Sequence, residues 1–254
     1  MADFHKILYT VESNIARITL NRPEKRNALN DEVVGELKEA VRFSAADQQV
    51  RVVLLEGAGK DFCSGADLAA LQTSSQYSVE QNMENARRMA ELFIAMRRHP
   101  RPIVAAVRGR ALAGGCGLAT AADLVLAAES AKFGYPEVNI GFIPAMVMAI
   151  LRRSVSEKRA FEMITGGEII TARQALEFGL INRVYPDDEF DVEVSSYAKA
   201  MASRSASAVT LSKTLLYYMD GLTFEAAIES GVHLNAIARM TDDCKRGVEK
   251  FLKK

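Results

Sequence analysis

The chain has 254 residues, of which 49% are hydrophobic, so it can bury a sizeable core in one large domain or two small ones. Its 32 lysine and arginine residues balance 32 aspartate and glutamate residues. This balance provides neither a basic surface for nucleic acid nor an acidic tail, and we therefore expect a small-molecule ligand.

The N-terminal segment alternates polar and apolar residues and lacks the continuous apolar stretch of a signal peptide. The longest uncharged apolar stretches, 111–122 and 138–151, are shorter than the ~20 residues that cross a bilayer. Cys63, Cys116 and Cys244 are odd in number and lack metal-ligand spacing, which is typical of reduced thiols, and we expect Cys63 and Cys116 to pack as small buried residues. We expect a cytoplasmic protein that binds neither a membrane nor a metal ion.

Five short apolar runs rich in valine, isoleucine and leucine are predicted strands, at residues 7–11, 15–20, 51–56, 103–107 and 124–127. The first two flank a polar turn and predict a β-hairpin. Between the later strands, residues 29–43 and 79–96 have helical spacing, and Asn30 or Asp31 is the predicted N-cap of the first helix. This alternation predicts an α/β fold with a covered, mainly parallel sheet.

Strand patterns stop near residue 187. Four helical stretches follow, at residues 192–201, 207–219, 224–238 and 242–252. We therefore divide the chain into a core of residues 1–190 and a C-terminal helical region of residues 191–254. That region carries more apolar surface than a few short helices can bury, so we expect it to pack on another subunit.

Two glycine-rich loops each follow a predicted strand. The first, GAGKDFCSGADL, occupies residues 57–68, and Asp67 suits the first turn of a helix that starts there. A tight turn and a ligand-binding loop both fit this motif alone. The second, GRALAGGCG at residues 109–117, has neither the Gly-Lys-Ser/Thr of a P-loop nor the dinucleotide-binding spacing. One N–H group from each loop could converge on a single carbonyl oxygen.

A lone glutamate stands in the third motif, FGYPEVNIG. Glu137 has no charged residue downstream of it before Arg152. Burial would raise its pKa toward a value useful for proton transfer, whereas the alternative is an exposed glutamate at the turn after Pro136. The three histidines lie in separate settings and no G-x-S-x-G elbow accompanies them, which argues against a Ser-His-Asp hydrolase.

Five segments together resemble the crotonase, or enoyl-CoA hydratase/isomerase, superfamily. They are DFCSGADL, RPIVAAVRGRALAGGCGLA, FGYPEVNIGFIP, ITGGEIITARQALEFGLINRV and TDDCKRGVEKFL, in the family's order and over nearly the whole chain. The resemblance implies a spiral of repeated ββα turns and C-terminal helices that form trimers or dimers of trimers. It also implies an acyl-CoA thioester substrate, so coenzyme A is part of the substrate and no separate cofactor is expected.

The resemblance also assigns site residues by their positions in these motifs. The N–H groups of Ala66 and Gly114 would form an oxyanion hole for the thioester oxygen, with Glu137 as the catalytic base. The residues implied to contact substrate or coenzyme A are Lys25, Arg26, Ala28, Ser64, Ala66, Asp67, Leu68, Gly114 and Gly117. Ala66, Asp67 and Leu68 would lie along the adenine, while the two cations either meet the phosphates or are ordinary surface residues.

One departure from the family pattern bears on the reaction. Family hydratases carry one glutamate just after the GGGC-type turn and a second in the FG-x-PE segment, whereas this chain has Gly117 and Glu137. Adding water uses one carboxylate to activate it and another to position it or supply a proton. The single glutamate favours double-bond isomerisation of a 3-enoyl-CoA. A hydratase with a replacement acid, and an acyl-CoA-binding protein without activity, are the alternatives.

Overall fold

Six strands form the main sheet of the computed structural model, which describes residues 4–253. In sheet order they are β1 (Ile7–Glu12), β2 (Ile15–Leu20), β3 (Val52–Gly57), β4 (Ile103–Val107), β6 (Leu124–Ala128) and β9 (Arg183–Tyr185). β1 is antiparallel to β2, and every other neighbouring pair is parallel. The predicted α/β class and mainly parallel sheet are confirmed, and the five predicted strands end within one residue of the observed bounds.

Local sequence signals determine the ends of the first elements. Ser13 and Asn14 connect β1 to β2 with φ angles of 50° and 65°, the left-handed pair that a tight hairpin requires. Helix α1 (Asp31–Ala46) begins after Asn30, whose side chain accepts a hydrogen bond from the Val33 N–H at 3.0 Å. Of the two predicted caps, Asn30 is therefore the observed one.

A second sheet of three short strands, absent from the sequence prediction, lies beside the first. It consists of β5 (Arg110–Leu112), β7 (Lys132–Gly134) and β8 (Ile169–Thr171), with β5 parallel to β7 and β7 antiparallel to β8. Each strand has three residues, too few to show an alternating pattern. This sheet holds the second glycine-rich loop against the first.

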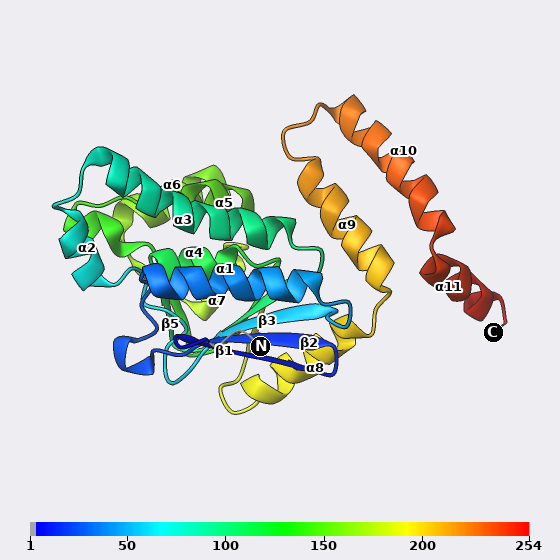
Figure 1. Cartoon of the computed structure of the whole chain (residues 1–254), viewed down its shortest axis with the longest axis horizontal. Helices are drawn as coiled ribbons and strands as arrows, with labels where there is room; N and C mark the ends of the chain where they lie inside the picture. Colours follow the sequence, from blue (N-terminus) through cyan, green and yellow to red (C-terminus); the bar gives the residue numbers. More distant parts are fainter. Residues whose placement is uncertain (1–3, 254) are drawn as a thin grey trace.

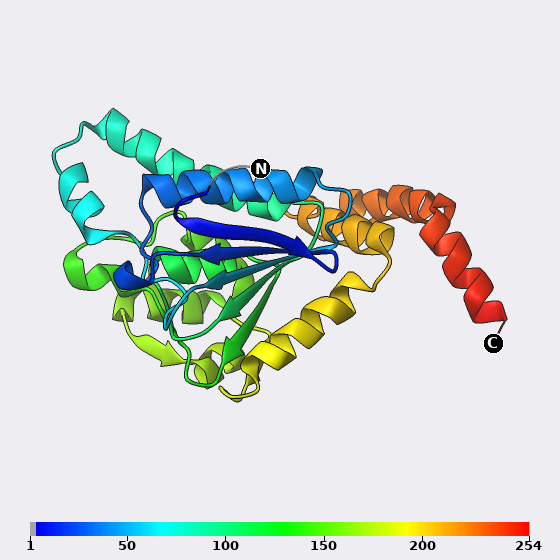
Figure 2. The ribbon, with the colours of Figure 1, turned by 60° about the horizontal axis from the view of Figure 1, so that its bottom comes forward.

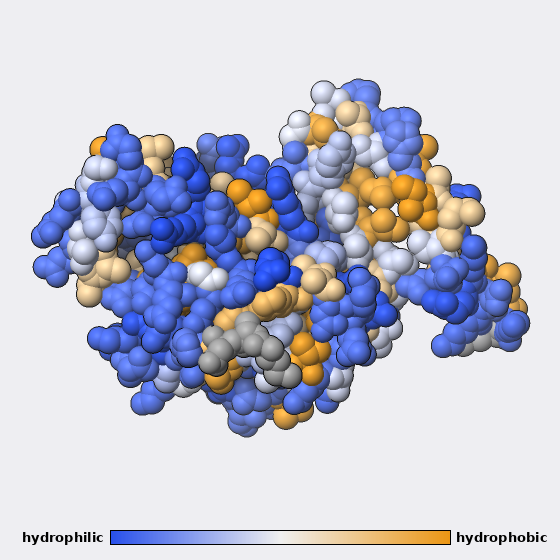
Figure 3. Space-filling view, in the orientation of Figure 1, coloured by the Kyte–Doolittle hydropathy of each residue, from blue (hydrophilic) through white to orange (hydrophobic). Residues whose placement is uncertain are grey.

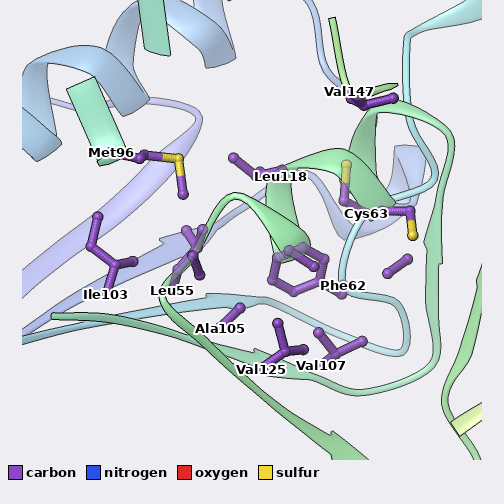
Figure 4. Packing of buried hydrophobic residues seen from close by; sticks show 14 of the residues in the cluster. Leu55, Phe62, Cys63, Met96, Ile103, Ala105, Val107, Leu118, Val125 and Val147 are labelled. Carbon is purple, nitrogen blue, oxygen red and sulfur yellow. The ribbon is translucent and has the colours of Figure 1, made fainter. Parts of the chain in front are cut away.

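Helices cover both faces of the main sheet (Figures 1 and 2). The remaining helices of the core are η1 (Pro23–Lys25), α2 (Leu68–Ser74), α3 (Val79–Arg98), α4 (Gly114–Thr120), η2 (Pro136–Ile140), α5 (Met148–Ser154), α6 (Glu157–Gly166) and α7 (Ala172–Glu177). On one face, α1, α3 and α4 pack on the sheet through buried residues such as Leu37, Leu92 and Leu118. Figure 4 shows part of this cluster.

Helix α8 (Phe190–Ala202) covers the opposite face of the main sheet (Figure 2). Its Phe190, Val194 and Ala198 are buried with Val52 and Leu126 of the strands. This packing continues past residue 190, where we divided the chain. The division into a core and a separate oligomerisation region stays a prediction.

The last three helices extend away from the sheet as an arm (Figure 1). They are α9 (Ala206–Tyr218), α10 (Phe224–Met240) and α11 (Asp242–Leu252), close to the predicted ranges. Neither α10 nor α11 contains a buried residue. Figure 3 shows apolar side chains gathered over α9 and α10, where Leu216, Phe224 and Met240 are 66–76% exposed. The expected packing on another subunit, as a trimer or a dimer of trimers, stays a prediction.

The base of this arm is attached to the core by a buried polar cluster. The Lys213 Nζ atom of α9 lies 2.7 Å from one carboxylate oxygen of Asp123, and the Tyr217 hydroxyl donates to the other at 2.6 Å. Burial lowers the pKa of Lys213 and the Asp123 charge opposes that effect. None of the helices described between residues 4 and 253 is long and apolar enough to cross a membrane.

Candidate functional site

The two glycine-rich loops lie side by side. Cys63 of the first loop pairs with Ala111 of β5 in an isolated parallel bridge. Its N–H donates to the Arg110 carbonyl at 2.9 Å, and its carbonyl accepts from the Leu112 N–H at 3.0 Å. The loops are therefore joined by backbone hydrogen bonds, although Cys63 and Ala111 are 48 positions apart in the sequence.

Two glycines allow this close approach. A Cβ atom on Gly65, whose φ is +97°, would lie 2.7 Å from the Ala113 Cβ. A Cβ atom on Gly115, at the start of α4, would lie 2.3 Å from the Cys63 carbonyl oxygen. Both distances are shorter than a carbon side chain tolerates, so the sequence needs glycine at these positions for the loops to meet.

We expect Gly115→Ala to lower the free energy of unfolding by about 1–3 kcal/mol, because the new methyl group collides with backbone. In most helices the same change is stabilising. Gly35→Ala in α1 is the matched control, since nothing lies within 4 Å of its Cβ position, and it should stabilise. Thermal melts of both variants check the prediction. A Gly115→Ala variant as stable as wild type would contradict the close approach.

Two backbone N–H groups, one from each loop, are unpaired and adjacent. Leu29 pairs with Ala66 in a parallel bridge: the Leu29 N–H donates to the Gly65 carbonyl, and the Leu29 carbonyl accepts from the Asp67 N–H, both at 2.8 Å. The N–H of Ala66, between these two residues, therefore points away from Leu29. Gly114 is the first residue of α4, so its N–H has no partner within the helix. Neither N–H makes a hydrogen bond to any group among residues 4–253.

The Gly114 backbone lies close to the Ala66 amide. A Cβ atom built on Gly114 would lie 4.0 Å from the Ala66 nitrogen, so the Gly114 backbone faces that amide across a small gap. Ala113, which precedes it, has φ +51° and ψ −128°, an unusual conformation for alanine that is held by its N–H donating to the Gly134 carbonyl at 2.8 Å. The small second sheet thus orients the Gly114 amide.

Glu137 lies in the short helix η2 and is buried, with 8% of its surface exposed. Its Oε2 atom is buried and has no hydrogen-bond partner. Among the side-chain atoms of residues 4–253, only Arg101 Nε is in the same situation. Burial raises the pKa of Glu137, opposed by a hydrogen bond from its own backbone. The alternative that Glu137 is an exposed turn residue is wrong.

Two buried hydroxyl groups, of Thr120 in α4 and of Tyr135 just before η2, lie close to each other. The Tyr135 hydroxyl and the Thr120 Oγ1 atom are 3.3 Å apart. Burial raises the pKa of Cys116 to about 12, and the Glu137 charge adds to this shift. Burial also raises the pKa of Cys63 to about 12. Both thiols are therefore neutral and pack as small apolar groups, as predicted.

At residue 117, where family hydratases carry a glutamate, an apolar side chain fills the space that a longer side chain would need. A Cβ atom on Gly117 would lie 2.0 Å from the Val147 Cγ1 atom, 3.0 Å from the Val147 Cβ and 3.6 Å from the Phe93 Cζ. Val147, just before α5, is 4% exposed and lies beside α4 in Figure 4. Sequence reasoning missed Val147 because only the tertiary structure brings it to Gly117.

The residues implied to contact coenzyme A lie on neighbouring loops. Ser64 and Arg26 are linked by a backbone hydrogen bond of 3.0 Å, and the Asp67 side chain caps α2 by accepting from the Ala69 N–H. Lys25, Arg26, Ala66 and Leu68 are exposed, Ser64, Asp67 and Gly114 are half-buried, and Ala28 and Gly117 are buried. Asp67 was expected in the first turn of α2 and is instead its N-cap. The roles of these residues stay predictions.

Two residues that sequence reasoning missed hold these loops together. Arg22 donates to the Ala28 carbonyl at 2.8 Å and to the Asp67 carboxylate at 3.2 Å. The buried Asn27 amide donates to the carbonyls of Ala58 and Asp61. Asn27 has φ +55°, a conformation that asparagine adopts more readily than most residues. The signal available in the sequence was that Arg22 and Asn27 stand in one polar loop.

Within residues 4–253, the side chains of histidine, cysteine, aspartate and glutamate form no group of three that could hold a metal ion. The arrangement instead offers proton transfer and hydrogen bonds. A buried, unpartnered carboxylate can accept a proton, and unpaired backbone N–H groups can stabilise an oxyanion that forms when it does.

Comparison with known proteins gives a consistent result. A family model described as enoyl-CoA hydratase/isomerase matches residues 10–254. A Thermus thermophilus relative, provisionally named an enoyl-CoA hydratase, is 39% identical over 243 residues, 96% of each chain. The 2,3-dehydroadipyl-CoA hydratase of Escherichia coli is 31% identical over 250 residues, 98% of this chain and 96% of that protein.

Solved structures of enoyl-CoA hydratases are also similar to this chain. The crystal structure of an enoyl-CoA hydratase from Mycobacterium smegmatis superposes with a TM-score of 0.94 at 32% identity, covering 98% of this chain and 96% of that one. The human enoyl-CoA hydratase domain-containing protein 3 superposes with a TM-score of 0.93 at 28% identity, covering 98% of each chain. The predicted crotonase-like fold is thereby confirmed. The chain belongs to the enoyl-CoA hydratase/isomerase family of the crotonase superfamily and is an enzyme of acyl-CoA thioesters.

Proposed function

We propose that the chain moves the double bond of a 3-enoyl-CoA thioester to the 2-position, with Glu137 as its single base. The amides of Ala66 and Gly114 form the oxyanion hole. The observation that supports this proposal is that Glu137 carries the one buried carboxylate among residues 4–253, combined with the closure of the other family carboxylate position by Val147 against Gly117.

The reaction needs no water. The Glu137 carboxylate takes a proton from C2 of the substrate, and the electron pair delocalises over C2–C4 and the thioester carbonyl. The carbonyl oxygen, now carrying negative charge, accepts hydrogen bonds from the Ala66 and Gly114 N–H groups. Glu137 then returns the proton to C4, so that a C2=C3 double bond replaces C3=C4 and the carbonyl re-forms. The same carboxylate acts as base and then as acid.

Burial of Glu137 makes its carboxylate a stronger base than a surface glutamate, since desolvation raises its pKa. The base must be ionised to start the reaction, so kcat/KM should fall as the pH falls through this raised pKa. We expect the acid limb of a pH–rate profile at higher pH than the usual glutamate range. A profile that is flat across the acid range, or falls only at the usual glutamate pKa, would contradict this role.

The remaining implied contacts complete the proposal. Ala66, Asp67 and Leu68 lie along the adenine part of coenzyme A, Ala28 and Ser64 contact the substrate or coenzyme A, and Lys25 and Arg26 are exposed cations for its phosphates. Gly117 lines the acyl side of the site. Coenzyme A enters as part of the substrate, and the protein requires no separate cofactor or metal ion. The C-terminal arm assembles a homotrimer or a dimer of trimers, and the protein works in the cytoplasm.

A hydratase is the second candidate, favoured by the names of the relatives. The Escherichia coli relative is named a hydratase, as is the crotonyl-CoA hydratase of Syntrophomonas wolfei, which is 32% identical over 253 residues, 99% of this chain and 96% of that protein. In that reaction the oxygen of water adds to C3 of a 2-enoyl-CoA and a proton adds to C2. A group other than residue 117 would then have to help hold the water.

The test is to incubate the protein with panels of 3-enoyl-CoA and trans-2-enoyl-CoA esters in heavy-oxygen water and to weigh the products. Double-bond migration without heavy oxygen is the expected result. A product heavier by one labelled water identifies a hydratase. Tight binding without turnover of any ester would identify a non-catalytic acyl-CoA-binding protein and would contradict the proposal.

A further inference from the structure

We propose that Val147 is the residue that determines which reaction this site performs, by occupying the space that a second catalytic carboxylate would need. The inference rests on the proposed function in one respect, the role of Glu137 as the base. It goes beyond that function because it assigns the reaction preference to a residue outside both glycine-rich loops and outside η2.

The geometry of α4 is the first step. Gly117 lies one turn after Gly114, and its N–H donates to the Ala113 carbonyl at 3.0 Å. The side-chain direction at residue 117 is therefore fixed by the same backbone that presents the Gly114 amide. A Cβ atom there meets the Val147 Cγ1 atom at 2.0 Å, far inside van der Waals contact, so every side chain longer than glycine requires Val147 to move.

The rigidity of the neighbour is the second step. Val147 is almost fully buried, and it belongs to the main hydrophobic cluster together with Phe93 of α3 and Leu151 of α5. Valine has few accessible rotamers, and the carbonyl of Val147 accepts the first backbone hydrogen bonds of α5, including one of 2.8 Å from the Leu151 N–H. The side chain cannot rotate out of the way without disturbing this packing.

The chemistry is the third step. A water molecule positioned for addition needs two to four polar partners. The Glu137 Oε2 atom has no polar partner among residues 4–253, and the side chains that meet the Cβ position of Gly117 are the apolar Val147 and Phe93. The three atoms nearest that position are all carbon, so it offers no polar group that could hold water. Gly117 and Val147 thus form a complementary pair, in which the glycine makes room for the valine.

Double-mutant cycles test the pair, with thermal stability and heavy-oxygen incorporation as separate readouts. The variants are Gly117→Glu, Val147→Gly and the combination. Gly117→Glu alone should lower Tm and gain no hydration. Adding Val147→Gly should recover part of the lost Tm and raise the rate of water addition to 2-enoyl-CoA by at least about 10-fold over wild type, since the second carboxylate then has room in the space that Val147 fills.

A second cycle keeps the inference testable if the charged variants do not fold. Gly117→Ala adds only the Cβ atom and should lower Tm in the wild-type background but much less in the Val147→Gly background. Val41→Gly is the matched control, because Val41 is a valine of the same cluster, 6% exposed, on α1, and does not approach the Gly117 Cβ. Its effect should simply add to that of Gly117→Ala.

The outcomes separate this inference from the proposed function. Heavy oxygen in the wild-type product overturns the proposed function and the assignment of reaction preference to Val147. Additive Tm changes in the Val147 cycle show that the pair is not coupled and overturn the inference, whatever the wild-type reaction is. Recovered stability without any gain in hydration also overturns it, because Val147 would then only fill space.

Discussion

Glu137→Gln should lower kcat by about 10²–10⁴-fold, the range that a positioned general base contributes. Glutamine has nearly the same shape as glutamate but cannot take the proton from C2, so the substrate should still bind and KM should change little. Steady-state kinetics with the best 3-enoyl-CoA measure both quantities. A Glu137→Gln variant that retains wild-type turnover would remove Glu137 from the mechanism.

The same substitution should make the protein more stable at neutral pH. Burial raises the pKa of Glu137 in the folded protein above its value in the unfolded chain. The folded state therefore holds a proton that the unfolded state has released, and stability falls as the pH rises through the window between these two pKa values. Above that window the folded state contains a poorly solvated charge, and glutamine removes it.

A Tm measurement across pH checks this effect. The Tm difference between Glu137→Gln and wild type should grow as the pH rises through the window and then stay constant. The exposed Glu168 supplies a matched control, and Glu168→Gln should leave activity unchanged. Loss of activity together with loss of stability at neutral pH would instead indicate a structural role for Glu137.

Gly114→Ala should lower kcat by about 10²–10³-fold, the usual effect of removing one oxyanion-hole donor. The added methyl group would lie 4.0 Å from the Ala66 nitrogen and 3.7 Å from the Leu29 Cδ1 atom, so it fits the fold without collision. It occupies the gap between the two amides, however, where the substrate oxygen must approach both nitrogens to about 2.7–3.1 Å.

Stability distinguishes this effect from misfolding. Because alanine suits the first turn of a helix better than glycine, Gly114→Ala should keep or slightly raise the Tm. Gly35→Ala, which also adds a methyl group to a helix without collision, should leave turnover unchanged. Wild-type turnover in Gly114→Ala would show that the thioester oxygen does not bind between the Ala66 and Gly114 amides.

Local signals in the sequence were sufficient for much of the fold. Apolar runs predicted five of the six strands of the main sheet to within one residue, because each has a buried face that only apolar residues satisfy. The three strands of the second sheet, and β9 of the main sheet, have three residues each, too few for a recognisable run of apolar residues. These short strands form because they pair with segments that are distant in the sequence. The arm helices were predictable because each spans several turns of helical periodicity.

For the site, the sequence by itself determined which groups are present: two glycine-rich loops, one glutamate in an apolar segment, and glycine at residue 117 in place of a second carboxylate. Only the tertiary structure decided how these groups meet. The pairing of Cys63 with Ala111 brings the Ala66 and Gly114 amides together, and burial leaves the Glu137 oxygen without a partner.

Val147 illustrates the difference most clearly. In the sequence it is one apolar residue among several, and in the structure it meets the Cβ position of Gly117 at 2.0 Å. Residue types and local propensities are properties of short segments and can be read along the chain. Desolvation, convergence of two amides and exclusion of a side chain depend on distances between segments, and those exist only once the core has packed.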